Sequence, residues 1–264
     1  MTVTRQQPAQ SGGSPTVSPG SAEKPPPSPA LSADNLVVGA SMLSVLLSIL
    51  IAVKILSPIL LTAAIFPFFI HVMKKGRHRR AAILTARWAI TVFICVVITA
   101  GFVSDRAEKS FPLAKTSVDV IEDWIAGTSD TPPADFKLLV GGIFAFVAAA
   151  AVSGGALAFV LASLALASSA CGSAFLFLQG DNILHILLIA VQPWLLCIFA
   201  AGIFLVVPSA SLLLKRCMAE PVPAGNKPLR RYIYVGTALF LLSIGLRIFT
   251  AGTWRAFTER WTIS

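Results

Sequence analysis

The sequence predicts an all-α integral membrane protein, a polytopic bundle of about seven transmembrane helices behind a disordered N-terminal tail. Hydrophobic residues make up 56% of the chain and charged residues 12%, and the mean hydropathy is +0.80, whereas a soluble domain carries roughly 25% charge. Several apolar runs reach the roughly 20 residues that cross a bilayer. Lysine and arginine gather between these runs, as in the cytoplasmic loops of membrane proteins.

Residues 1–33 contain seven prolines together with many serines, glycines and glutamines. Such a segment cannot bury enough apolar surface to offset the entropy lost on ordering. We therefore expect a disordered tail, and a proline-rich docking peptide is the alternative. The transmembrane domain then covers residues 34–264.

The first two spans are expected at 36–53 and 58–73. Between residues 36 and 73 the only charge is Lys54, and one helix of that length would measure about 57 Å, too long for a hydrocarbon core of roughly 30 Å. Lys54 and Pro58 mark the turn, because the residue before a proline avoids the helical conformation. Asp34 is placed to cap the first helix.

The third span is expected at 81–103, after the segment KKGRHRR at 74–80. Five of the seven residues in that segment are lysine or arginine, which predicts a cytoplasmic loop. Arg87 lies about 9 Å inside the span at helical rise. It is either a buried functional cation or a side chain that extends back to the headgroups, and we favour the second interpretation.

The long loop at 104–137 holds seven acidic and four basic residues, which favours the outer face. Within it, Val118, Ile121, Trp124 and Ile125 recur at helical spacing with acidic residues between them. This pattern predicts a short amphipathic helix on the membrane surface. The same helix could instead cap the bundle or meet a partner.

Residues 138–180 carry no charge and would form about 64 Å of helix. Two spans, 138–153 and 156–178, follow if the run breaks at Ser153-Gly154-Gly155, and six spans in total remain if it does not. A stripe of small residues lies along this run, and we interpret it as a helix-packing surface, with the lining of a solute path as the alternative. The stripe consists of Gly154, Ala158, Ala162, Ala165, Ser169 and Gly172.

The sixth span is expected at 183–207, with Gln192, Pro193 and Trp194 near its centre. A proline there frees a backbone carbonyl, and broken helices with polar groups at the midplane form binding sites in many transporters. Together with Arg87, these residues are a candidate solute or packing site. A simple packing kink is the favoured alternative.

The last span is expected at 232–250, after a basic loop at 215–231. With seven spans, the inner segments hold 12 lysines and arginines and the outer segments hold seven. This asymmetry places the N-terminus in the cytoplasm and the C-terminus outside, in a plasma (inner) membrane.

Several chemistries are missing from the sequence. All twelve carboxylates are expected outside the spans, and the three histidines lie at span ends or in a loop. No HExxH, GxSxG, Walker A or dinucleotide-binding motif is present, and the four cysteines lack CxxC spacing. We therefore expect no enzymatic activity, no cofactor, no metal and no nucleic-acid partner.

The uncharged core and the small-residue stripe predict an accessory or scaffold subunit that acts through helix–helix contacts with other membrane proteins. Its partners are then the lipid bilayer and other membrane subunits or further copies of the chain. The alternative is a small permease for a neutral or hydrophobic solute, with its site at Pro193.

Overall fold

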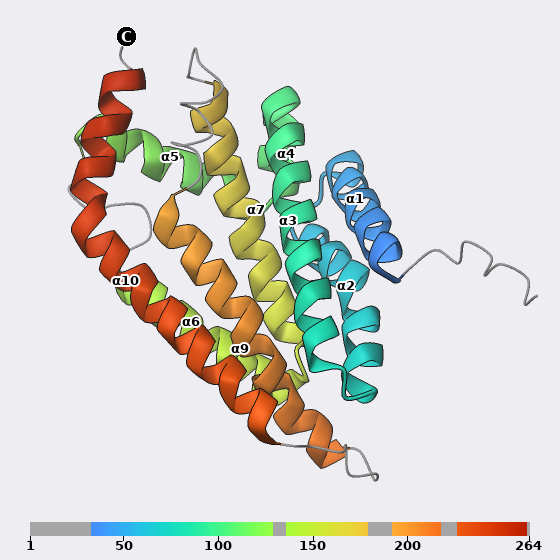
Figure 1. The fold of residues 1–264 in the computed structure, drawn as a ribbon. Helices are drawn as coiled ribbons and strands as arrows, with labels where there is room; N and C mark the ends of the chain where they lie inside the picture. The colour runs from blue at the N-terminus through green and yellow to red at the C-terminus, as the bar shows by residue number, and fades with distance from the viewer. Residues whose placement is uncertain (1–32, 129–135, 179–191, 218–225, 263–264) are drawn as a thin grey trace, which may run out of the picture. The chain divides into compact units, whose positions relative to one another are not determined.

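The computed structural model describes residues 33–128, 136–178, 192–217 and 226–262, and every regular element in these ranges is an α-helix. The long helices run side by side and alternate in direction along the chain (Figure 1). Of the predicted tail, residues 1–32 lie outside the described residues. The helices are α1 (Ala33–Ile51), α2 (Leu56–Lys74), α3 (His78–Phe102), α4 (Ser104–Ser110), α5 (Ala114–Ile125), α6 (Phe136–Ser153), α7 (Ala156–Leu178), α9 (Pro193–Cys217) and α10 (Asn226–Thr262).

Six of the described helices are long and apolar enough to cross a membrane, namely α1, α2, α3, α7, α9 and α10. Helix α6 adds a shorter apolar segment, Val140–Ser153. Because a lipid-exposed backbone must satisfy its own hydrogen bonds, apolar helices of this length are the form that a chain takes inside a bilayer. The predicted class, a polytopic bundle of transmembrane helices, is confirmed.

The turn between α1 and α2 contains Ala52, whose φ of 52° lies in the left-handed region. Ser57 and Pro58 fall in the first turn of α2, and the Ser57 hydroxyl donates to the Lys54 carbonyl at 3.2 Å. The first N–H groups of a helix have no partner within it. Pro58 therefore loses nothing by lacking an N–H.

Helices α6 and α7 are joined by two glycines with positive φ, Gly154 at 63° and Gly155 at 106°. The Gly155 N–H donates to the carbonyl of Ala150 at 3.1 Å and closes the end of α6. Glycine enters this backbone region without the steric cost of a Cβ. The uncharged run at 138–180 thus contains two helices with a break at the predicted glycines, of which α7 is a candidate span and α6 a shorter apolar helix; the count of seven spans stays a prediction.

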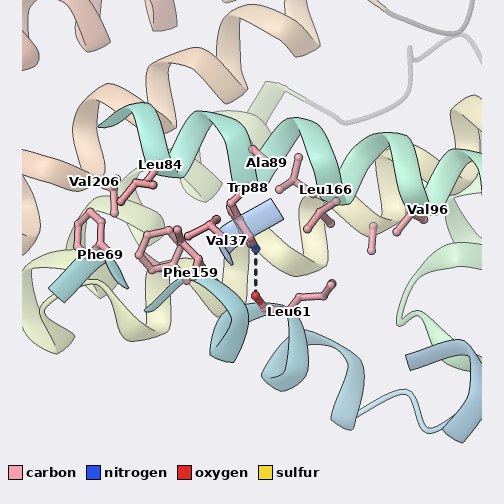
Figure 2. Packing of buried hydrophobic residues seen from close by; sticks show 14 of the residues in the cluster. Val37, Leu61, Phe69, Leu84, Trp88, Ala89, Val96, Phe159, Leu166 and Val206 are labelled. Atoms are coloured by element: carbon pink, nitrogen blue, oxygen red, sulfur yellow. Dashed lines mark hydrogen bonds between the residues drawn. The ribbon is translucent and has the colours of Figure 1, made fainter. Parts of the chain in front are cut away.

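An aromatic cluster connects α2, α3 and α7 in the core. The Phe159 ring meets Phe69 and Trp88 edge to face, with ring centroids 4.9 and 5.4 Å apart. The Trp88 indole N–H donates to the Leu61 carbonyl at 3.0 Å (Figure 2). The three rings are almost fully buried, so the cluster fixes the relative positions of these helices through both packing and a hydrogen bond.

Buried hydroxyls are mostly satisfied within their own helix. On α1, Ser41, Ser44 and Ser48 are all buried, and each donates to a backbone carbonyl three or four residues earlier. Between helices, the Thr62 and Ser163 hydroxyls are 3.4 Å apart and join α2 to α7. These small polar residues allow helices to approach closely without leaving an unpaired group in the core.

The predicted amphipathic helix is α5, and it packs on the C-terminal half of α7. Ile121 and Trp124 are buried, and Ile121 lies so close to Gly172 that a Cβ added there would be 2.5 Å from its Cδ1. The apolar face of α5 is therefore occupied by the bundle, as in the capping alternative.

The connections that carry most basic residues lie at one end of the bundle. The α2–α3 turn, the α6–α7 turn, the end of α9 and the start of α10 all lie at the bottom of Figure 1. Helices α4 and α5 lie at the other end.

Candidate functional site

The predicted site residues Gln192, Pro193 and Trp194 lie at the beginning of α9, not in the middle of a helix. Pro193 is the first residue of α9, and the Gln192 carbonyl accepts from the N–H groups of Leu195 and Leu196 at 3.0 and 3.3 Å. Proline is well suited to this position because its φ is already helical and its missing N–H is not needed. Residues 183–191 of the predicted span lie outside the described residues, so the helix break expected at Pro193 stays a prediction.

Gln192 and Trp194 are both buried at this helix end. The Trp194 ring packs edge to face on Trp254 of α10, with centroids 6.2 Å apart. Arg247 of α10 is also buried, although it lies inside a candidate span. A buried cation and a buried amide give this part of the α9–α10 pair polar character in an apolar setting.

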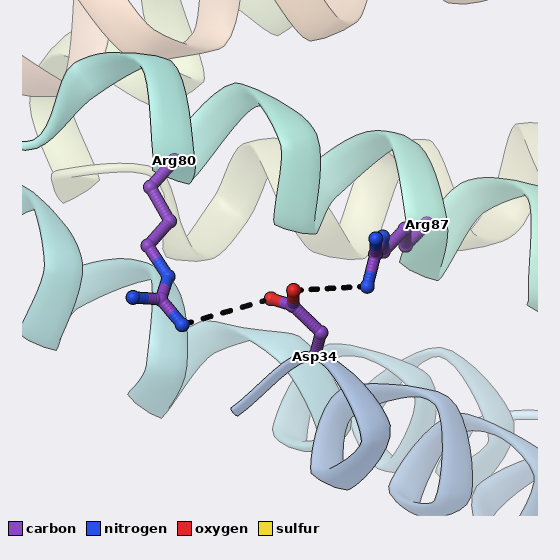
Figure 3. Close-up of polar contacts among 3 residues, drawn as sticks. All are labelled: Asp34, Arg80 and Arg87. Atoms are coloured by element: carbon purple, nitrogen blue, oxygen red, sulfur yellow. Dashed lines mark ion pairs between the residues drawn. The ribbon is translucent and has the colours of Figure 1, made fainter. Parts of the chain in front are cut away.

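Arg87 forms a separate polar group with Asp34 and Arg80, between α1 and α3. Asp34 lies in the first turn of α1, and its carboxylate is 2.9 Å from Arg87 Nη1 and 4.0 Å from Arg80 Nη2 (Figure 3). The carboxylate is partly buried, with 24% of the side chain exposed, whereas the two arginines are 48% and 43% exposed. The group carries two positive charges and one negative charge.

This arrangement changes one expectation. Asp34 was expected before the first span, but the candidate span of α1 begins at Asp34 itself. Arg87 was expected to extend toward the headgroups, which stays a prediction; its guanidinium contacts the carboxylate in the first turn of α1. A charge in an apolar helix needs a counter-charge or water, and α1 supplies the counter-charge.

The structure does not bring all predicted solute-site residues together. Arg87 lies in the first half of α3, and Gln192 immediately precedes α9, which runs in the opposite direction (Figure 1). Arg87 and Gln192 therefore lie in opposite halves of the bundle.

The residues of the predicted small-residue stripe do not share one environment. Gly154 lies in the α6–α7 turn, Ala158 and Gly172 are buried, and Ala165 is exposed; the remaining members, Ala162 and Ser169, are half-buried. The most buried side of α7 is offset from the stripe and contains Phe159, Ser163, Leu166, Ala167, Ala170 and Ala174.

A small cavity of about 80 Å³ lies between the C-terminal ends of α3 and α7 and the helices α4 and α5. Its lining is mostly apolar, with Glu108 and Cys171 as its chemically distinctive groups. Among the described residues, no three histidine, cysteine or acidic side chains cluster closely enough to hold a metal ion.

Sequence reasoning missed Asp34 and Arg80 as site residues. The available signal was a carboxylate at the start of the first helix and an arginine inside a later span, two charges that the membrane favours as a pair. Asp34 and Arg87 are far apart in the sequence, so no spacing rule predicted that they would pair. Comparison with known protein families, curated proteins and solved structures gives no match.

Proposed function

We propose that this protein is an accessory or scaffold subunit that acts through helix–helix contacts with other membrane proteins. The observation that carries the proposal is the weak packing of α10 within its own chain. Of the residues in the apolar window of α10, 17% are buried, against 56% in α7. Helix α10 packs chiefly on α9 (Figure 1), which leaves most of its surface for lipid or for another protein.

The free side of α10 combines small and large residues in the manner of membrane helix interfaces. Leu241 and Ile248 are well exposed, and Gly245 and Gly252 have no atom within 4 Å of the position that a Cβ would occupy. Steps of three and four residues place these four residues on one face. Small residues on an outer face permit a second helix to approach the backbone, which is the main source of association between helices in lipid.

The proposed setting is the plasma (inner) membrane, with the N-terminus in the cytoplasm and the C-terminus outside. The common location of the α2–α3 turn, the end of α9 and the start of α10 supports this orientation, because these segments are rich in lysine and arginine. Basic loops are retained on the cytoplasmic side of membranes.

The permease alternative has less support. It depends on a helix break with polar groups near the middle of a span, and the described residues show only the start of α9 at Pro193. The observation that supports a permease is that two polar residues, Gln192 and Arg247, are buried.

The proposal predicts that Gly245→Leu abolishes partner recovery without unfolding the chain. The full-length tagged protein is purified from its native membranes in a mild detergent, and co-purifying membrane proteins are quantified by mass spectrometry. A leucine fits in the open space at Gly245, so the variant should fold, whereas its side chain prevents close approach of a second helix. We expect at least a tenfold loss of the partner.

Gly39→Leu is the matched control, because Gly39 lies on α1 with the same open space around it. The control should recover the partner as the wild type does. A wild-type protein that is recovered as a single chain, or a Gly245→Leu variant that recovers every partner, contradicts the scaffold function.

A further inference from the structure

The Asp34, Arg80 and Arg87 group, which we call the inner charge cluster, has hydrogen-bonding capacity to spare. Within the described part of the chain, the Arg87 guanidinium makes one ion pair, in which Nη1 lies 2.9 Å from Asp34 Oδ2. The Arg80 guanidinium lies 4.0 Å from Asp34 Oδ1, too far for a hydrogen bond. A guanidinium has five N–H donors, so most donors of the cluster remain for another acceptor.

The cluster also has uncompensated charge. Two guanidinium groups face one carboxylate, and both arginines are nearly half exposed. Arg80 further belongs to the basic segment 74–80. The ligand that satisfies these groups is therefore an anion with several oxygens, and a phosphate fits the planar, forked geometry of arginine particularly well.

Apolar side chains continue from the cluster along the outside of α3. Arg87 stands in a line of exposed isoleucines at helical spacing, each between 40% and 59% exposed: Ile83, Ile90, Ile94 and Ile98. From Arg87 to Ile98 this line measures about 16 Å at helical rise. This surface has a cation at one end and an exposed apolar ridge beyond it. A phospholipid fits it, because the headgroup can contact the cation while the acyl chain lies along the ridge.

We propose that the inner charge cluster binds the phosphate headgroup of an anionic phospholipid, whose acyl chain lies along the isoleucine ridge of α3. Arg80 and Arg87 bind the phosphate oxygens, and Asp34 holds the Arg87 guanidinium in place. Asp34 also offsets part of the positive charge, so it orients the site and weakens it at the same time. The occupant is a lipid rather than free phosphate because the ridge offers an acyl chain a surface that an inorganic ion cannot use.

The test measures lipid retention by the full-length protein in native mass spectrometry. Detergent-purified protein is mixed with phosphatidylglycerol or phosphatidylcholine that carry the same acyl chains. One basic residue near a membrane surface contributes about fivefold to anionic lipid binding. We expect wild-type protein to retain phosphatidylglycerol at least fivefold more than phosphatidylcholine, and the R80Q/R87Q double variant to retain both equally.

Arg77→Gln is the matched control for charge. Arg77 is exposed and lies three residues before Arg80 in the same basic segment, so its replacement removes one charge without touching the cluster. We expect this control to keep the lipid preference. A control that loses as much preference as the R80Q/R87Q variant would show a diffuse attraction to the basic segment and would overturn the site.

Asp34→Asn separates a lipid site from a purely structural ion pair. Removal of the carboxylate frees Arg87 for the phosphate and raises the charge of the cluster, so we expect phosphatidylglycerol retention to increase several-fold. An ion pair that only joins α1 to α3 predicts no increase. Equal retention of the two lipids by the wild type, a loss of retention in Asp34→Asn, or displacement of the lipid by an equal concentration of inorganic phosphate each overturns the proposal.

Discussion

At the scale of single residues, Trp88 contributes the most distinctive contact in the core. Its ring is 1% exposed and packs on Phe159, and its N–H bonds the Leu61 carbonyl of another helix. Burial among the helices removes the competition with water that weakens such a bond in solution. Trp88 therefore combines shape and hydrogen bonding in one side chain.

We predict that Trp88→Phe lowers the stability of the bundle by about 1–3 kcal/mol, through the lost hydrogen bond and the void left by the smaller ring. Thermal unfolding of the purified protein in detergent measures the change. The control is Phe102→Leu, at a side chain that is 87% exposed; it should stay within about 0.5 kcal/mol of the wild type. Equal effects of the two substitutions would contradict this account of the core.

The sequence could not predict which residues meet across the core. Phe69, Trp88 and Phe159 each lie in an apolar run, and nothing in the local pattern distinguishes them from the exposed aromatic residues nearby. The pair between Asp34 and Arg87 is similar, because its members come from different helices and no spacing rule connects them. Contacts of this kind depend on how helices pack, which periodicity does not encode.

At the scale of the element, the α6–α7 turn depends on a backbone conformation that only glycine adopts easily. Gly155 has a φ of 106°, and a Cβ there would lie 3.2 Å from the ring of Phe69. A side chain at this position would therefore be disfavoured both by the backbone conformation and by the nearby Phe69 ring.

Gly155→Ala is predicted to destabilise the protein by about 1–3 kcal/mol, because alanine is strained at this φ. The same substitution at Gly142 should act in the opposite direction. Gly142 is inside α6 and has no atom within 4 Å of an added Cβ, so alanine should add up to about 1 kcal/mol through its higher helix propensity. Thermal unfolding of both variants checks the sign, and a destabilised Gly142→Ala would count against the described environment of α6.

Helix positions followed well from the sequence where charges, prolines or glycines marked their ends. Helices α1, α2, α3, α6 and α7 all lie within three residues of their expected ranges. The buried side of α7 did not follow, because a helix that is apolar on every side has no polar face to identify the inner one. Pro193 is ambiguous in sequence for a related reason: a proline can begin a helix or bend one, and the surrounding apolar residues fit both cases.

At the scale of the whole molecule, the alternating helices carry the basic connections to one end of the bundle (Figure 1). We predict that cysteines placed at Lys75 and Arg230 are shielded from a membrane-impermeant maleimide in intact cells, whereas a cysteine at Thr128 is labelled. The native cysteines are first replaced by alanine. Positive charge retained in the cytoplasm is the physical reason.

All three positions are exposed in the described structure, so protection reports the membrane side rather than burial in the protein. Permeabilised cells provide the control, in which all three cysteines should react. Labelling of cysteines at positions 75 and 230 on opposite sides would contradict the proposed orientation.

The two-glycine connection between α6 and α7 has a consequence for biogenesis. A link of two residues cannot reach across a hydrocarbon core of roughly 30 Å, so the end of α6 and the start of α7 must lie on the same side of the membrane. Once α6 spans the bilayer, no polar loop holds α7 in water, and α7 is expected to insert directly behind α6 as the second arm of a hairpin.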